Sequence, residues 1–229
     1  MISILFAAAA AAATPACPDL LTVEAFTCKA MVAARAGDSA KAAAMFEQGA
    51  GLANAGDAQI ARMLAAAGNL WIEAGDADKS AADLDKALAL KELAGPQRGE
   101  ALLDRARAAE AKGDLAAARN NVTQAASLVP GDPFLWYFSA SLAMREGNAV
   151  TAQSAIAKAL ALAPADATIL FEAGHVAQFA GDDVGAREYW RRAVEREPNG
   201  SAGRAAREAL AMLPAPLVVK SDPAPKERK

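Results

Sequence analysis

Histidine and cysteine are scarce in this chain of 229 residues, which has one histidine, His175, and two cysteines, Cys17 and Cys28. Zinc sites and cysteine–histidine catalytic pairs need several such residues at characteristic spacings, and the sequence has no such spacing. It also lacks a glycine-rich loop followed by Lys-Ser or Lys-Thr, which would bind the phosphates of a nucleotide. We therefore expect no metal, no cofactor and no enzymatic activity.

Aromatic residues are also few, at 5%, although hydrophobic residues make up 54% of the chain. Much of the hydrophobic share is alanine, which favours helices and buries little area per residue. The formal net charge is −3, whereas phosphate binding usually needs a basic face. The composition therefore predicts many closely packed helices and argues against nucleic acid as the main partner.

The N-terminus holds the one long hydrophobic run, from Ile4 to Ala13, followed by small residues. This pattern is typical of a secretory signal, so we expect residues 1–16 to be a signal peptide cleaved after Ala13 or Ala16. An uncleaved N-terminal helix and lipid attachment at Cys17 are the alternatives. No other segment is long enough to cross a membrane. We expect an exported, periplasmic protein of a bacterium, without a transmembrane segment in the mature chain.

The two cysteines leave two interpretations open. An oxidising compartment would allow a disulfide between Cys17 and Cys28 that closes a short loop. Alternatively, Cys28 is a small core residue and Cys17 is lost or free.

A repeated turn divides the chain into five units. Glycine is followed by aspartate or asparagine, and each pair stands between two helical patterns. Glycine suits the left-handed conformation that ends a helix, and the next side chain suits the cap of a new helix. The pairs are Gly37-Asp38, Gly75-Asp76, Gly113-Asp114, Gly147-Asn148 and Gly181-Asp182.

A stripe of small and large residues at i, i+4 and i+7 follows each pair, which places three side chains on one helical face. The small residues allow two helices to approach closely, and the middle residue fills the space between them. The stripes are Ala42, Phe46, Gly49; Ser80, Leu84, Ala87; Ala118, Val122, Ala125; Ala152, Ile156, Ala159; and Ala186, Trp190, Ala193.

These units resemble the tetratricopeptide repeat (TPR) family, whose unit is a helix-turn-helix of 34 residues. The first-helix signature is visible in Leu64, Ala67-Gly68 and Trp71, and again around Trp136. The resemblance implies an all-α fold: an α-solenoid of five degenerate repeats over residues 17–213, closed by a capping helix at 201–213. Residues 214–229 are rich in proline and end in basic residues, so we expect a disordered tail there.

The resemblance also implies a concave groove lined by the first helices of the repeats. Aromatic residues in such a groove would be anchors for a peptide or helix, while several of them could instead fill the core between repeats. The residues placed in this partner-binding groove are Phe134, Tyr137, Phe138, Ser141, Met144, Phe171, His175 and Phe179, with Asn69 and Arg107 as polar contacts. The earlier repeats place a polar mixture there that includes Glu24, Thr27, Met31 and Arg62.

We therefore expect a non-enzymatic scaffold or adaptor of the bacterial cell envelope that binds a protein or peptide. One alternative is self-association, in which the aromatic end of the groove packs against another copy to form a homo-oligomer. The other is an envelope enzyme or carrier that uses His175 with Glu172, which lies three residues before it.

Overall fold

The computed structural model describes residues 17–54, 56 and 58–214, and these residues form eleven α-helices and no strand. The all-α prediction is thus confirmed. The expected signal peptide and all but the first residue of the expected tail lie outside the described residues. The chain divides into two compact units, residues 1–128 and residues 129–229, and each is described by itself.

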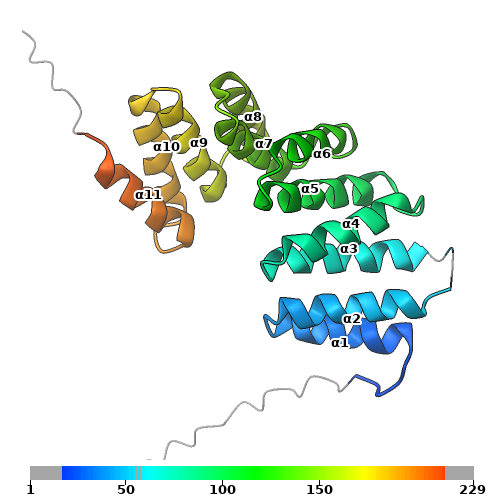
Figure 1. Ribbon diagram of the computed structural model, residues 1–229. Helices are drawn as coiled ribbons and strands as arrows, with labels where there is room; N and C mark the ends of the chain where they lie inside the picture. Colours follow the sequence, from blue (N-terminus) through cyan, green and yellow to red (C-terminus); the bar gives the residue numbers. More distant parts are fainter. Residues whose placement is uncertain (1–16, 55, 57, 215–229) are drawn as a thin grey trace, which may run out of the picture. The chain divides into compact units, whose positions relative to one another are not determined.

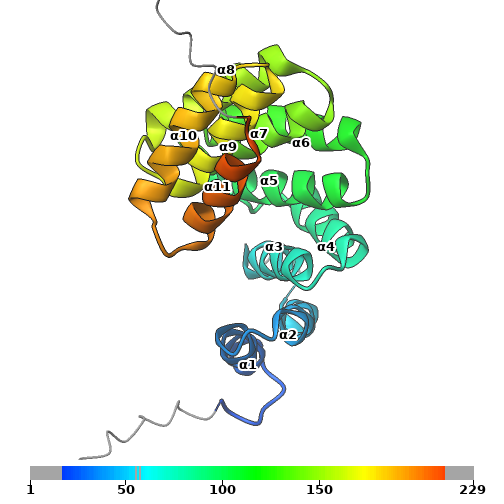
Figure 2. The same ribbon diagram turned by 90° about the vertical axis from the view of Figure 1, so that its left-hand side faces the viewer.

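The first unit is a stack of three helix hairpins (Figures 1 and 2). In Figure 2, α1 and α2 are seen nearly along their axes as two neighbouring rings. Each helix packs against the next along the chain. The helices are α1 (Val23–Arg35), α2 (Ser39–Leu52), α3 (Ala58–Glu73), α4 (Ala77–Ala89), α5 (Gly95–Ala111) and α6 (Leu115–Leu128).

The second unit has two hairpins and one further helix, and α11 packs against both α9 and α10. This arrangement matches the expected capping helix, because α11 covers the last hairpin with Ala202, Gly203 and Ala206 buried beneath it. The helices are α7 (Pro133–Arg145), α8 (Ala149–Leu162), α9 (Ala167–Phe179), α10 (Asp183–Arg196) and α11 (Ser201–Met212).

The repeated glycines adopt the conformation that the sequence predicts. Gly37, for example, has φ +77° and Gly181 has φ +83°, in the left-handed region that a residue with a side chain rarely adopts. The aspartate or asparagine after each glycine accepts a hydrogen bond from the backbone N–H three residues later; Asp38 accepts from Lys41 at 3.0 Å. Each hairpin therefore turns by the same local chemistry.

The predicted stripes form the contact between the two helices of each hairpin. All of their residues are buried except Phe46, which is half-buried. A Cβ atom at Gly68 would collide with the Leu84 side chain, because the backbone of α3 approaches α4 so closely. A small residue on one helix, such as Gly68, thus makes room for a larger side chain of the other helix, such as Leu84.

The turn glycines Gly37, Gly75 and Gly113 are 38 residues apart, whereas Gly113, Gly147 and Gly181 are 34 apart. The four extra residues in each of the first two intervals lengthen helices of the stack. Helix α3 has 16 residues and α5 has 17, whereas α7 and α9 have 13 each. Most of the additional length is thus absorbed as about one extra helical turn.

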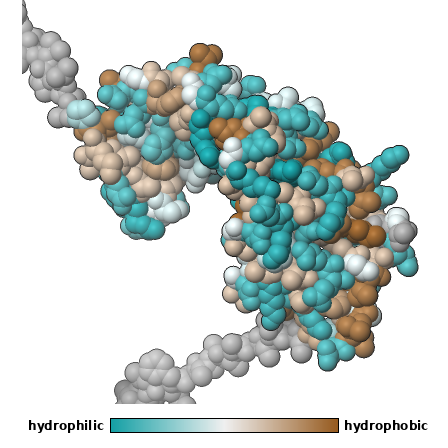
Figure 3. Space-filling view, in the orientation of Figure 1, coloured by the Kyte–Doolittle hydropathy of each residue, from teal (hydrophilic) through white to brown (hydrophobic). Residues whose placement is uncertain are grey.

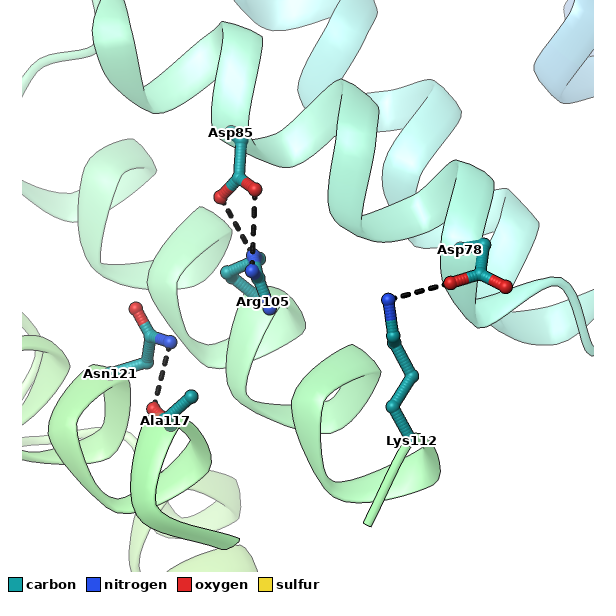
Figure 4. A network of polar contacts seen from close by, with 6 residues as sticks. All are labelled: Asp78, Asp85, Arg105, Lys112, Ala117 and Asn121. Atoms are coloured by element: carbon teal, nitrogen blue, oxygen red, sulfur yellow. Dashed lines mark hydrogen bonds and ion pairs between the residues drawn. The ribbon is translucent and has the colours of Figure 1, made fainter. Parts of the chain in front are cut away.

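Ion pairs join the second and third hairpins at the surface (Figure 4). Arg105 of α5 donates hydrogen bonds to both carboxylate oxygens of Asp85 on α4, at 2.7 and 3.2 Å. Lys112 Nζ lies 2.6 Å from Asp78 Oδ1 at the beginning of α4. Within α6, Asn121 donates to the carbonyl oxygen of Ala117 at 2.9 Å. The bidentate geometry orients α5 on α4, although exposed pairs add little stability.

Across the part of the chain that the structure describes, every helix is too short or too polar to cross a membrane.

Candidate functional site

The first two hairpins leave a groove between their first helices. Helix α3 packs against α5, and α7 packs against α9, whereas α1 and α3 make no comparable contact in the described part of the chain. The space between them is a groove of about 620 Å³, large enough for several side chains of a bound peptide. It is lined by Val23, Glu24, Thr27, Cys28, Met31, Val32 and Arg35 of α1, Phe46 of α2, and Gln59, Arg62 and Met63 of α3.

Apolar side chains form much of the groove surface. Met31 and Val32 are 47% and 39% exposed, which is high for large hydrophobic residues in adjacent positions. Phe46 and Met63 lie deeper, being half-buried and 6% exposed. Figure 3 shows hydrophobic and hydrophilic surface side by side on this unit. Exposed apolar residues that line a groove are a common feature of binding surfaces.

Glycine at position 49 allows Met63 to line the groove. A Cβ atom at Gly49 would overlap the terminal methyl group of Met63 and would lie 3.3 Å from Phe26 Cβ. Because α2 has no side chain at this position, the Met63 side chain fits between α2 and α3. The shape of the groove therefore depends on a residue that does not line it.

Three charged residues surround the apolar surface. Arg35 and Arg62 are both exposed, and among the described residues neither has an ion-pair or hydrogen-bond partner. Glu24 is likewise exposed and unpaired within the described ranges. The two guanidinium groups are thus available to bind carboxylates, for which their planar donor geometry is well suited.

A disulfide forms part of the groove wall. Cys17 and Cys28 are bonded, with their Cα atoms 5.7 Å apart, and Cys28 lines the groove. The segment between them is also held by an ion pair of 3.3 Å between Lys29 and Asp19. Thr22 caps α1 by accepting a hydrogen bond from the Ala25 N–H at 3.2 Å. Of the two interpretations that the sequence left open, the structure has the bonded one.

Asn69 and Arg107, the two polar residues chosen from the sequence, both bind one acid inside the first unit. Asn69 Nδ2 donates to Asp104 Oδ2 at 2.9 Å, and Arg107 Nη1 donates to Asp104 Oδ1 at 3.0 Å. Burial raises the pKa of Asp104, against these two hydrogen bonds, which lower it. The Asn69–Asp104 hydrogen bond joins α3 to α5, and Arg107 pairs with Asp104 within α5. Contact of Asn69 or Arg107 with a partner stays a prediction.

In the second unit, the predicted aromatic residues of α7 lie together. The Phe134 ring stacks on Tyr137 with centroids 5.6 Å apart, and lies 6.5 Å from Phe138. Phe134 is 41% exposed, whereas Phe138 is only 6% exposed. Met144 is half-buried against the core. Some of these residues thus fill the core, which was the other interpretation of the aromatic positions.

The predicted residues of α9 divide in the same way. His175 packs edge-on against Phe171 and Trp190, with centroid distances of 4.5 and 5.3 Å, and burial lowers its pKa. Phe179 is 44% exposed at the end of the helix.

Glu172 lies in different surroundings from His175. It is 7% exposed and bonded to Ser141 of α7, and burial raises its pKa. His175 has aromatic neighbours, and Glu172 has a serine from the adjacent hairpin. Among the described residues, no three histidine, cysteine, aspartate or glutamate side chains gather where they could hold a metal ion.

Sequence reasoning placed Glu24, Thr27, Met31 and Arg62 on the concave side but did not select them as a site. The signal that was available is the pair of adjacent large apolar residues Met31 and Val32 on α1. No sequence pattern within α1 predicts that α1 and α3 do not pack closely, because their separation depends on how the side chains of α2 and α3 pack.

No protein-family model matches the chain, and no curated protein matches its sequence. Solved structures with the same fold are numerous. The type IV pilus biogenesis factor PilW is 19% identical, with 81% of this chain and 82% of that chain covered and a TM-score of 0.69. TTC0263, a thermophilic TPR protein of Thermus thermophilus, is 16% identical, with 83% and 100% covered and a TM-score of 0.67.

A third similar structure is YrrB, described as a TPR protein with an unusual peptide-binding site; it is 18% identical, with 80% and 91% covered and a TM-score of 0.57. At these identities the likeness concerns the fold alone. The hairpins, their glycine turns and these structures agree: the chain has the fold of the tetratricopeptide repeat proteins.

Proposed function

We propose that the protein is a non-enzymatic scaffold that binds a peptide segment of a partner protein in the groove between α1 and α3. The observation that carries this proposal is the groove of about 620 Å³ with an exposed apolar surface and two unpaired arginines. A buried apolar contact supplies affinity, and the charges fix the direction of the peptide.

The partner segment is apolar and carries at least one carboxylate. Met31, Val32 and Phe46 offer contacts to aliphatic or aromatic side chains, while Arg35 and Arg62 attract an acid. Because Glu24 would repel a nearby acid, the carboxylate of the partner segment binds near Arg35 and Arg62. Because the hairpins are already stacked, the groove loses little conformational entropy when a peptide enters.

The aromatic group on α7 and α9, with Phe134 and Phe179 exposed, is a second contact surface of the same scaffold in this proposal. Its partner is a protein or peptide as well, because stacked aromatic rings are common anchors at protein interfaces. Self-association through this surface is the alternative, and it is tested together with the groove below.

The site of action is the bacterial cell envelope. The Cys17–Cys28 disulfide supports this location, because disulfides persist in oxidising compartments such as the periplasm. The hydrophobic run from Ile4 to Ala13 fits export by the secretory route. The fold shared with two pilus-related proteins, PilW and the pilF product of Pseudomonas aeruginosa, fits an envelope adaptor.

Site-specific photo-cross-linking tests the proposal. A photoreactive phenylalanine analogue replaces Met31 in the groove, and a control chain carries it at Gln48, an exposed position of α2 that does not line the groove. We expect an adduct from position 31 only, with the cross-linked peptide identified by mass spectrometry as an acidic, apolar segment. Equal adducts from both positions, or none, would contradict the groove; adducts with a second copy of the chain would support self-association instead.

A further inference from the structure

Asp83 of α4 is the most deeply buried charged side chain among the described residues, with 2% of its surface exposed. Its Oδ1 atom pairs with Lys86 Nζ at 3.0 Å. Its Oδ2 atom is buried and, within the described ranges, has no conventional hydrogen-bond partner. A buried carboxylate oxygen without a hydrogen-bond donor destabilises the fold. The group that faces Asp83 Oδ2 therefore determines whether this oxygen receives a hydrogen bond.

Glu47 of α2 faces Asp83 from the preceding hairpin, and the two carboxyl groups are in hydrogen-bonding contact. Glu47 Oε1 already accepts a hydrogen bond from the indole N–H of Trp71 on α3, at 2.6 Å. Two ionised carboxylates have no donor between them, so a hydrogen bond forms only when one of them carries a proton.

The cations at this junction are Lys86 and Lys79, both on α4. Lys86 pairs with Asp83, and its charge lowers the pKa of Glu47, as does the Trp71 hydrogen bond. Lys79 Nζ lies 4.1 Å from the centroid of Trp71. Helix α1 adds no ion pair or hydrogen bond to Glu47 among the described residues. Burial and the contact with Asp83 outweigh the indole and the charge of Lys86, so the pKa of Glu47 is raised.

The later hairpins do without this arrangement, so the fold does not require it. The positions that correspond to Asp83 in the later hairpins are occupied by Asn121, Ala155 and Tyr189, none of which is acidic. The positions that correspond to Trp71 are all alanine: Ala109, Ala143 and Ala177.

We propose that Glu47 donates a proton to Asp83 Oδ2, and that this one shared proton fastens α2 to α4 across the first two hairpins. When the proton leaves at higher pH, the carboxylate of half-buried Glu47 faces the carboxylate of buried Asp83, and the junction loosens. Phe46, next to Glu47, lines the groove. pH thereby regulates the groove, a consequence that rests on the proposed function, whereas the proton-dependent junction does not.

The sign of the effect follows from the pKa of Glu47, which is higher in the folded protein than in the unfolded chain. Between those two values the folded protein binds more protons than the unfolded chain. The stabilisation by the pair is therefore complete below the ordinary pKa of a glutamate and is lost as the pH rises through the folded pKa.

Glu47→Gln tests the proposal in the full chain. The glutamine carbonyl can still accept from Trp71, while its N–H can donate to Asp83 Oδ2 at every pH. The matched control is Glu195→Gln, which makes the same charge change at an exposed residue of α10. The readout is the hydrogen-exchange protection factor of α2 and α4, measured by mass spectrometry at about pH 5 and about pH 7.5, with intrinsic exchange rates removed.

We expect protection of α2 and α4 to fall several-fold from the lower to the higher pH in the wild type and in Glu195→Gln, and to stay constant in Glu47→Gln. Asp83→Asn, which offers an N–H to ionised Glu47, should also stay constant, while Asp83→Ala should lose protection at both pH values. The proposal would be overturned if the protection of α2 and α4 fell with pH in Glu47→Gln as much as in the wild type. It would also be overturned if Glu47→Gln had lower protection than the wild type at the higher pH. No partner is needed, so a failure here is distinct from a failure of the cross-linking experiment.

Discussion

The indole ring of Trp190 lies against the bare backbone of Gly174, and its Nε1 atom donates a hydrogen bond to the carbonyl oxygen of Phe171 at 3.0 Å. Trp190 is 1% exposed, so the ring is almost fully enclosed between α9 and α10. Glycine at this one position lets the two helices of the last hairpin meet around the largest side chain of the core.

Gly174→Ala should therefore destabilise the second unit by about 2 kcal/mol, because the rigid indole cannot move away from an added methyl group. Gly51→Ala is the control: this helical glycine has open space around it, so alanine should stabilise α2 by up to about 1 kcal/mol. Urea unfolding followed by tryptophan fluorescence and circular dichroism measures both changes. Equal effects of the two substitutions would mean that Trp190 does not pack on Gly174.

Removal of the disulfide should loosen the beginning of the first unit. The bond joins residues 11 apart, and the loop-entropy model gives about 3 kcal/mol for a loop of this size. We expect Cys17→Ser with Cys28→Ser to lower the urea midpoint of the first unit, and dithiothreitol to have the same effect on the wild type but none on the variant. An unchanged midpoint in the wild type with reductant would contradict the structural role of the bond.

The pKa of His175 should lie below its ordinary value of about 6.5, because the ring is packed between Phe171 and Trp190. Folded protein then binds fewer protons than the unfolded chain between the two pKa values, so stability falls as the pH falls through that window. His175 is the only histidine of the sequence, and its ring protons can be followed by NMR without ambiguity. The urea-unfolded chain supplies the reference; identical titrations in the two states would contradict the packing.

Much of the fold could be predicted because its determinants are local. Each left-handed glycine and its capping neighbour act within one turn, and the stripe beginning at Ala42 repeats in every hairpin. The capping helix is equally visible, since its small residues face one side. Chemistry that recurs at a fixed spacing identifies the repeat without any knowledge of contacts between distant residues.

Less of the candidate site could be predicted, because it depends on pairings between helices. Asn69 was assigned to a partner, and in the structure it donates a hydrogen bond to Asp104, a contact set by the register of α3 against α5. The groove exists where α1 and α3 fail to pack together, and the positions of Phe46 and Met63 decide that spacing. The sequence pattern predicts which face of its helix a residue occupies, but it does not predict which residue of another helix that face contacts.

The depth of the groove should respond to Gly49. In Gly49→Ala the added methyl group displaces the end of the Met63 side chain, which is flexible and can move into the groove. We expect a small change in stability, since alanine favours the helix, together with loss of groove volume. A crystal structure of the variant measures the displacement, and an unmoved Met63 would contradict the prediction.

The charge preference of the groove can be measured with two labelled peptides of alternating leucine and either aspartate or lysine. The arginines Arg35 and Arg62 outnumber Glu24, so the acidic peptide should bind more tightly than the basic one. Because exposed ion pairs contribute about 1 kcal/mol or less, the expected difference for each arginine is up to about fivefold in Kd. Fluorescence anisotropy at low ionic strength gives both constants.

Arg62→Glu should then weaken binding of the acidic peptide and strengthen binding of the basic one. Arg207→Glu makes the same charge change at an exposed residue of α11, in the other unit, and should alter neither constant by more than about twofold. If both substitutions shift the two peptides alike, the net charge of the chain and not the groove selects the ligand. If the acidic peptide binds the wild type no better than the basic one, Arg35 and Arg62 do not direct recognition.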